Sequence, residues 1–153
     1  MVVGGIFYFS RTNNNDTSSS PVNKTVSQTV KEKPKAIVYK SPTCGCCKLY
    51  VAYLKKQGFD VEVKDMTDTS SIKKKYGVTD DKVSCHTTIV GNYFFEGHIP
   101  VEAINKVLKE TPAIQGIALP GMPSGSPGMP GAKEPFVIYA VNNDGGTYEF
   151  ARM

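Results

Sequence analysis

The chain has 153 residues and a formal net charge of +4, and 40% of its residues are hydrophobic. This length is sufficient for one domain with a modest core and too short for two ordinary domains. The 18 basic residues are spread among 14 acidic ones, without a basic stripe carrying interleaved aromatic residues, which argues against a nucleic-acid-binding protein.

The N-terminal part of the chain differs in composition from the rest. Residues 1–10 are apolar and uncharged, but they are too few to span a membrane and lack a basic n-region. Residues 11–35 are polar and rich in Ser, Thr and Asn, without apolar periodicity, which is typical of a linker. We therefore interpret 1–10 as the remnant of an export signal or anchor, 11–35 as a linker and 36–153 as the folded domain.

Apolar periodicity in the first half of this domain predicts alternating strands and helices. The expected elements are strand 36–39, helix 48–57, strand 59–63, helix 70–76, strand 87–90, strand 93–95 and helix 101–109. This βαβαββα order predicts an α/β fold with a thioredoxin-like core.

The C-terminal part is expected to add to that core. Residues 112–134 are rich in Pro and Gly and predict an irregular loop. Residues 135–140 and 147–151 flank the turn-forming segment NNDGG and predict an added β-hairpin. The predicted fold is therefore a thioredoxin-like core followed by a Pro/Gly-rich loop and a hairpin.

Three of the four cysteines lie within the short segment SPTCGCCKLY, as Cys44, Cys46 and Cys47. Such crowding favours metal binding or redox exchange over a framework of structural disulfides. Cys44 and Cys47 form a C-x-x-C pair near the start of a predicted helix, where unpaired N–H groups and the helix dipole stabilise a thiolate. Thiolates are the nucleophiles of disulfide exchange and soft ligands for Cu(I). We predict Cys44 and Cys47 as the redox-active pair and all three cysteines as metal ligands.

Cys85 is predicted to be the fourth ligand. It precedes the third predicted strand, in the loop that faces the redox motif of a thioredoxin core, and the sequence there reads SCHT instead of carrying the usual cis-proline. A buried Cys85 acting only as a small hydrophobic residue is the alternative. Four cysteines would also suit zinc or an iron–sulfur cluster, but the usual ligand spacings of both are missing, so copper is favoured.

Three further residues are candidate copper ligands. His86 adjoins Cys85 and offers a ring nitrogen to Cu(II) or a supporting hydrogen bond. Met122 and Met129 occupy matched PGMP repeats in the Pro/Gly-rich loop, and thioether sulfur suits Cu(I). The alternative is that these methionines only cover an apolar surface. His98 is expected at the surface or as a helix-capping residue.

The segments SPTCGCCKLY, GFDVEVKDM, SCHTTIVGNYFFEGHIPVEAI and IALPGMPSGSPGMPG occur in this order, and together they resemble the CopG-type copper-tolerance proteins of Gram-negative bacteria. The resemblance covers roughly residues 35–151. It implies a periplasmic, thioredoxin-like protein that binds copper through Cys44, Cys46, Cys47 and Cys85 and interconverts Cu(I) and Cu(II). Copper ions are then the expected partners, other periplasmic copper-handling proteins are candidate partners, and the N-terminus is a candidate membrane tether.

Three functions remain open, and whether the protein is an enzyme depends on them. A copper oxidoreductase would bind Cu(I), in a single site or a thiolate-bridged cluster of several ions, and use the dithiol/disulfide couple to change its oxidation state. A passive copper buffer or chaperone would need the same ligands without electron transfer. A protein disulfide reductase would use Cys44 and Cys47, but the extra thiol at Cys46 and the missing cis-proline argue against it. The copper oxidoreductase is the leading hypothesis.

Overall fold

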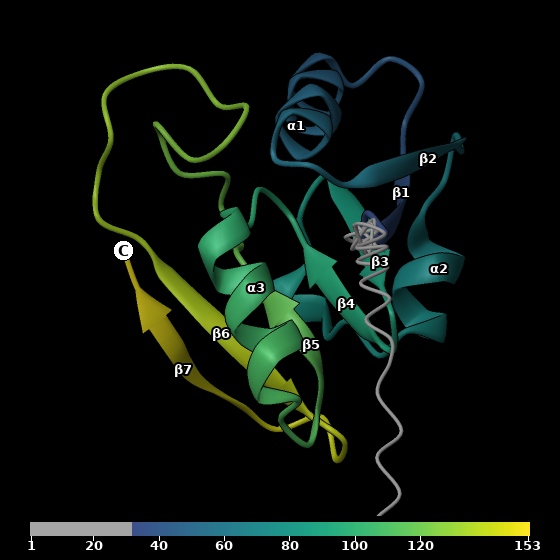
Figure 1. Ribbon diagram of the computed structural model, residues 1–153. Coiled ribbons are helices and arrows are strands. Elements are labelled where there is room, and N and C mark those ends of the chain that lie inside the picture. Colours follow the sequence, from purple (N-terminus) through teal and green to yellow (C-terminus); the bar gives the residue numbers. More distant parts are fainter. Residues whose placement is uncertain (1–31) are drawn as a thin grey trace, which may run out of the picture. The chain divides into compact units, whose positions relative to one another are not determined.

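The computed structural model describes residues 32–153, so the predicted signal remnant 1–10 and most of the predicted linker 11–35 lie outside the described residues. The elements are β1 (Lys35–Lys40), α1 (Gly45–Lys56), β2 (Asp60–Asp65), α2 (Ser70–Lys75), the 3-10 helix η1 (Asp80–Lys82), β3 (His86–Val90), β4 (Tyr93–Glu96), α3 (Val101–Glu110), β5 (Ile114–Ala118), β6 (Val137–Asn142) and β7 (Thr147–Arg152). Figure 1 shows this arrangement. Within the described part of the chain, no helix is both long enough and apolar enough to cross a membrane.

Within residues 32–153, seven strands form one mixed sheet in the order β2-β1-β3-β4-β5-β6-β7. The pairs β1/β2 and β4/β5 are parallel, and each is connected through a helix, because parallel neighbours need a crossover. All other neighbouring strands are antiparallel. The predicted α/β class is confirmed, and the helices and strands from β1 to α3 follow the predicted order.

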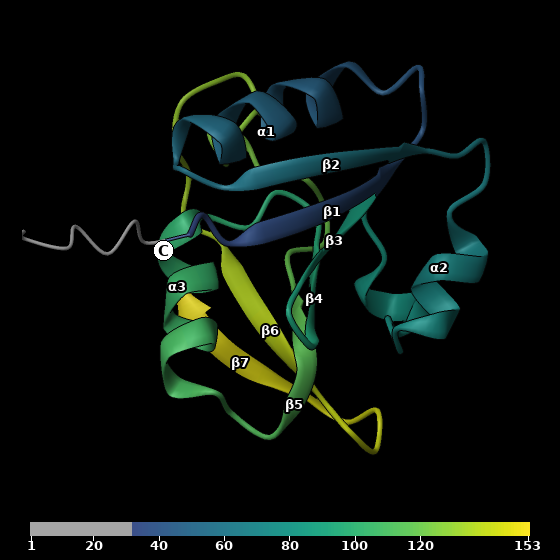
Figure 2. The same cartoon turned by 45° about the vertical axis from the view of Figure 1, so that its right-hand side comes forward.

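Each face of the sheet carries its own hydrophobic cluster. In β1, Ala36 and Val38 belong to the larger cluster, which includes the buried sides of α1 and α3, whereas Ile37 and Tyr39 contact the smaller one. This division follows from the alternation of side chains along a strand. The segment that follows α2 adds Val78 to the smaller cluster. Figure 2 accordingly shows α2 across the sheet from α1 and α3.

The C-terminal part differs from the prediction in one element. Residues 114–118, inside the predicted irregular loop 112–134, form β5, which lies between β4 and β6. Gly116 suggested a loop, yet it is required by packing, because a Cβ at this position would lie 2.2 Å from the carbonyl oxygen of Phe94. The predicted hairpin is confirmed as β6 and β7, and it extends the sheet beyond β5.

Candidate metal centre

Helix α1 begins inside the cysteine run. Gly45 is its first residue, rather than residue 48 as predicted, and Cys44 is the N-cap. The Sγ atom of Cys44 accepts a hydrogen bond from the backbone N–H of Cys47 at 3.3 Å, and the Cys44 N–H donates to the Ser41 carbonyl at 3.2 Å. The CGCC sulfurs therefore stand at the positive end of the α1 dipole, where a thiolate is stabilised.

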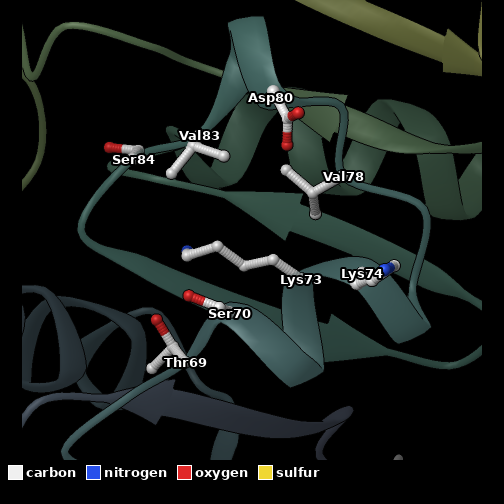
Figure 3. Close-up of a pocket in the computed structure, with 8 residues that line it drawn as sticks. All are labelled: Thr69, Ser70, Lys73, Lys74, Val78, Asp80, Val83 and Ser84. Carbon is white, nitrogen blue, oxygen red and sulfur yellow. The ribbon is translucent and has the colours of Figure 1, made fainter.

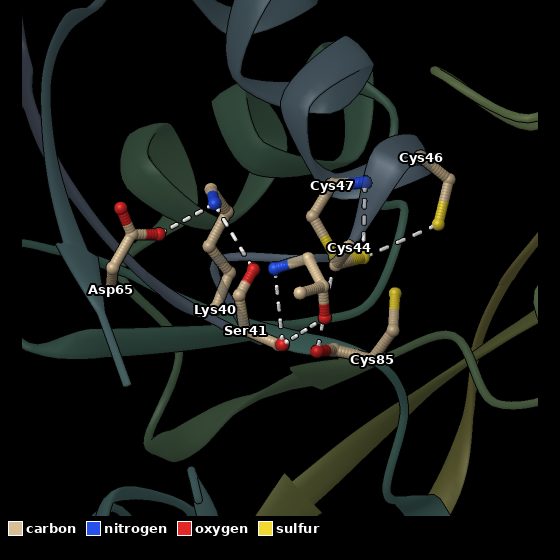
Figure 4. Close-up of polar contacts among 8 residues, drawn as sticks. Lys40, Ser41, Cys44, Cys46, Cys47, Asp65 and Cys85 are labelled. Carbon is tan, nitrogen blue, oxygen red and sulfur yellow. Dashed lines mark hydrogen bonds and ion pairs between the residues drawn. A yellow bond between two sulfur atoms is a disulfide. The ribbon is translucent and has the colours of Figure 1, made fainter. Parts of the chain in front are cut away.

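The structure brings the four cysteines into one cluster. The sulfur atoms of Cys44, Cys46, Cys47 and Cys85 all lie within 4.8 Å of one another. Cys44 and Cys47 are joined in a disulfide, whereas Cys46 and Cys85 are free thiols (Figure 4). The Sγ atom of Cys46 lies 3.5 Å from that of Cys44. Cys47 is buried and the other three are half-buried, so the cluster is open to solvent on one side.

Two imidazole rings contact Cys85. Its Sγ atom lies 3.2 Å from Nδ1 of His86 and 3.2 Å from Nε2 of His98. The expectation that His98 lies at the surface or caps a helix is wrong, because its side chain is 0% exposed. Gly97, at a φ of +79°, lets the chain turn back at the end of β4, and a Cβ there would lie 2.7 Å from the Ser84 hydroxyl oxygen. This tight turn carries His98 to Cys85.

Both histidines are neutral. The Nδ1 atom of His98 lies 2.7 Å from the carbonyl oxygen of Pro127, which only accepts, so Nδ1 carries the proton and Nε2 presents a lone pair to Cys85. Burial lowers the pKa of His98 and lowers that of His86 well below its ordinary value. Repulsion from the Lys73 ammonium, and from His98 whenever that ring is protonated, adds to the effect at His86. Among residues 32–153, Nε2 of His86 is buried without a hydrogen-bond partner.

The free thiol of Cys85 is protonated at neutral pH. Burial raises its pKa to about 11, with the neighbouring Cys46 adding to the effect. A metal ion that binds Cys85 must therefore displace the proton. Neutral His86 and His98 next to this sulfur complete a second group of metal-ligating atoms that shares Cys85 with the four-cysteine cluster.

Comparison with known proteins identifies similar solved structures. Two solved structures, described as forms 2 and 1 of the copper resistance protein CopG, are each 34% identical to this chain and match 80% of it. The matches cover 99% and 98% of those two chains, with TM-scores of 0.75 and 0.74. The chain belongs to the CopG family. A family model described as a protein of unknown function, DUF411, matches residues 82–129, and no curated protein matches in sequence.

In this CopG family member, a buried polar network holds the segment before Cys85. The Glu96 carboxylate accepts hydrogen bonds from the Ser84 N–H at 2.6 Å, from the Thr87 hydroxyl at 2.6 Å and from the Lys73 ammonium at 2.5 Å. Burial raises the pKa of Glu96, and the Lys73 charge opposes this shift. The sequence interpretation missed this network, because Lys73 stands in a run of three lysines that resembles a solvated helix face.

A second buried lysine anchors the strand before the CGCC motif. The Nζ atom of Lys40 lies 2.6 Å from Oδ1 of Asp65 and 3.1 Å from the Ser41 carbonyl oxygen, and Figure 4 shows both contacts beside the cysteines. These contacts fasten the end of β1, from which the loop to Cys44 starts, to the end of β2.

The Pro/Gly-rich loop packs against the start of α1. A Cβ at Gly128 would lie 2.8 Å from the Tyr50 backbone nitrogen and 3.2 Å from the Cys46 carbonyl oxygen, so only glycine permits this approach. Met129 follows directly and is half-buried, whereas Met122 is 42% exposed. Their role as copper ligands remains a prediction.

A cavity of about 480 Å³ opens between α2 and the segment that leads to β3 (Figure 3). Its lining residues are Thr69, Ser70, Lys73, Lys74, Val78, Asp80, Val83 and Ser84. No cysteine is among them, and the Lys73 ammonium is hydrogen-bonded to Thr87 and Glu96. The cavity therefore borders the polar network and is separate from the cysteine cluster.

Proposed function

We propose that this protein binds Cu(I) through Cys44, Cys46, Cys47 and Cys85 and changes the oxidation state of copper with the Cys44–Cys47 couple. The observation that carries this proposal is the approach of four sulfur atoms to within 4.8 Å of one another, with one pair already oxidised to a disulfide. The sulfur ligands and the two-electron Cys44–Cys47 dithiol/disulfide couple thus belong to the same site.

The chemistry of the donor atoms favours copper. Thiolates are soft ligands that bind Cu(I), and neutral imidazole accepts copper in either oxidation state. The described group of Cys85, His86 and His98 can therefore extend the cysteine site on its buried side. The copper resistance proteins of the same family support the choice of this metal over zinc.

The electrons balance with the cysteines alone. Two Cu(II) ions accept one electron each and become Cu(I), while the thiols of Cys44 and Cys47 lose two protons and join as a disulfide. The reverse reaction reduces the disulfide and oxidises Cu(I). The free thiols of Cys46 and Cys85 remain available to hold the product Cu(I).

We further propose that the core is thioredoxin-like and that the protein acts in the periplasm. The order β2-β1-β3-β4, with a C-x-x-C pair at the start of α1, supports the first proposal. A disulfide in the described domain supports the second, since disulfides persist in oxidising compartments. Other periplasmic copper-handling proteins are proposed as partners that deliver or accept the metal.

The test separates binding from electron transfer. The fully reduced, metal-free domain is titrated anaerobically with Cu(I) against a Cu(I) chelator, with a variant that carries Ser at all four cysteine positions as the control. Cu(II) is then added to the reduced domain, and Cu(I) formation is measured together with closure of the Cys44–Cys47 disulfide. Absence of Cu(I) binding would overturn the proposal, whereas binding without Cu(II) reduction would identify a passive buffer.

A further inference from the structure

We infer that Cys46 and Cys85 form a second disulfide, so that the site has three redox states rather than two. This inference rests on the proposed function, because it assigns a role to the two cysteines that the Cys44–Cys47 couple does not use. Both are free thiols, both are half-buried, and their sulfur atoms lie within 4.8 Å of each other. In Figure 4 the two sulfurs point into the same space beside the existing disulfide.

The closure needs only a local movement. Cys46 lies in the first turn of α1, and Cys85 lies in the connection between η1 and β3, outside both elements. A disulfide requires an S–S distance of about 2 Å, so the sulfurs must approach by less than about 3 Å. The backbone on both sides of Cys85 is held by the bond from the Ser84 N–H to Glu96 and by the pairing of β3, so Cys85 stays beside Cys46.

Cu(II) is the oxidant for this step. The thiols of Cys46 and Cys85 lose two protons and two electrons, the electrons reduce two Cu(II) ions to Cu(I), and the two sulfurs join. Four cysteines then supply four electrons in two steps, twice the number that one C-x-x-C pair supplies. Cys46, the additional cysteine within the CGCC motif, thereby serves as the partner of Cys85 in the second disulfide.

The two steps have different consequences for bound copper. With only Cys44–Cys47 closed, Cys46 and Cys85 still offer two sulfurs, and His86 and His98 contact one of them. Closure of Cys46–Cys85 removes the last thiolates from the cluster, and the soft ligands of Cu(I) with them. The second disulfide is therefore a release step: without thiolates the site retains His86 and His98 but binds Cu(I) more weakly.

A pair of double variants tests the inference. The C44S/C47S variant retains only Cys46 and Cys85, and C46S/C85S retains only Cys44 and Cys47. Each is reduced, treated anaerobically with excess Cu(II), and assayed for thiols, for Cu(I) and for its mass under non-reducing conditions. We expect both variants to lose their thiols as monomers, and wild type to form about twice as much Cu(I) per chain as either. A third variant, C44S/C85S, retains Cys46 and Cys47 and controls for unspecific oxidation.

Peptide mapping of the wild type provides evidence that does not depend on the folding of variants. Trypsin separates residues 41–48, which contain the CGCC motif, from residues 83–106, which contain Cys85. After Cu(II) treatment we expect these two peptides to be linked by a disulfide and to carry no free thiol. Unlinked peptides in wild type, retained thiols in C44S/C47S, or oxidation of C44S/C47S only as a dimer would overturn the second disulfide, provided that wild type still forms Cu(I) and closes the Cys44–Cys47 disulfide. Failure of wild type to bind Cu(I) at all would instead overturn the proposed function.

Discussion

The Nε2 atom of His98 lies 3.2 Å from the Sγ atom of Cys85, and the opposite ring nitrogen bonds the Pro127 carbonyl. One buried ring thus connects the Pro/Gly-rich loop to the cysteine cluster. The hydrogen bond to Pro127 holds the proton on Nδ1 and leaves Nε2 free to act as an acceptor or a ligand. The position of the loop and the donor properties of the site are therefore coupled.

We expect His98→Gln to weaken Cu(I) binding by the reduced domain by about 10- to 100-fold, the usual effect of removing an orienting partner or ligand at a metal site. The amide of Gln retains a donor for Pro127 but lacks the imidazole lone pair. Competition with a Cu(I) chelator measures the change, and the free energy of unfolding of the metal-free variant is measured in parallel. Unchanged affinity would exclude a contribution of His98 to the site.

Gly128 and Gly121 offer a matched comparison, because both have a φ of +80°. In Gly121→Ala the new Cβ meets nothing within 4 Å, so we expect a loss of about 1 kcal/mol of unfolding free energy from backbone strain alone. In Gly128→Ala the Cβ would lie 2.8 Å from the Tyr50 nitrogen, so we expect a further loss of about 1–3 kcal/mol from displacement of the loop. Urea unfolding measures both; equal losses would show that the loop does not press on α1.

Glu96→Ala should be among the most destabilising single substitutions. It leaves the buried Lys73 ammonium without a counter-charge, which costs about 3–5 kcal/mol of unfolding free energy. Lys73→Met combined with Glu96→Leu should recover much of this loss, because no unpaired charge remains. As a control, Glu62→Ala breaks the exposed ion pairs with Lys35 and Lys64 and should leave the free energy of unfolding almost unchanged. A double variant no more stable than Glu96→Ala would refute this explanation.

The metal-free domain should lose stability as the pH falls below 6.5. The pKa values of His86 and His98 are lower in the folded state than their ordinary value of 6.5, so the unfolded state takes up protons first. The contribution of the two histidines to the free energy of unfolding is complete above pH 6.5. It is lost as the pH falls from 6.5 to the lower pKa that each histidine has in the folded state. Urea unfolding of the disulfide form at a series of pH values measures the slope, which should be smaller in His98→Gln. A free energy of unfolding that does not fall below pH 6.5 would contradict the neutral burial of both rings.

Local patterns in the sequence are sufficient to predict most of the helices and strands. Helices α1 and α3 and the turn between β6 and β7 each depend on residues within one short segment. They can therefore be predicted from the local sequence, without knowledge of the segments that pack against them. The strand β5 is not predicted because Gly116 weakens the strand pattern. The reason for a glycine at this position is its close contact with Phe94 of β4, which only the folded chain shows. The start of α1 was placed too late because Gly45, Cys46 and Cys47 show no apolar period.

For the candidate site, the sequence alone predicts sulfur as the donor atom and places CGCC at a strand-to-helix junction, since both depend on residues that are neighbours along the chain. It also indicated that Cys85 would approach, because the order of elements places its loop beside that junction. The burial of His98 against Cys85 and the pairing of Lys73 with Glu96 become visible only in the folded chain. Residues far apart along the chain meet there through the register of the sheet and one tight turn at Gly97, and neither leaves a periodic signal in the sequence.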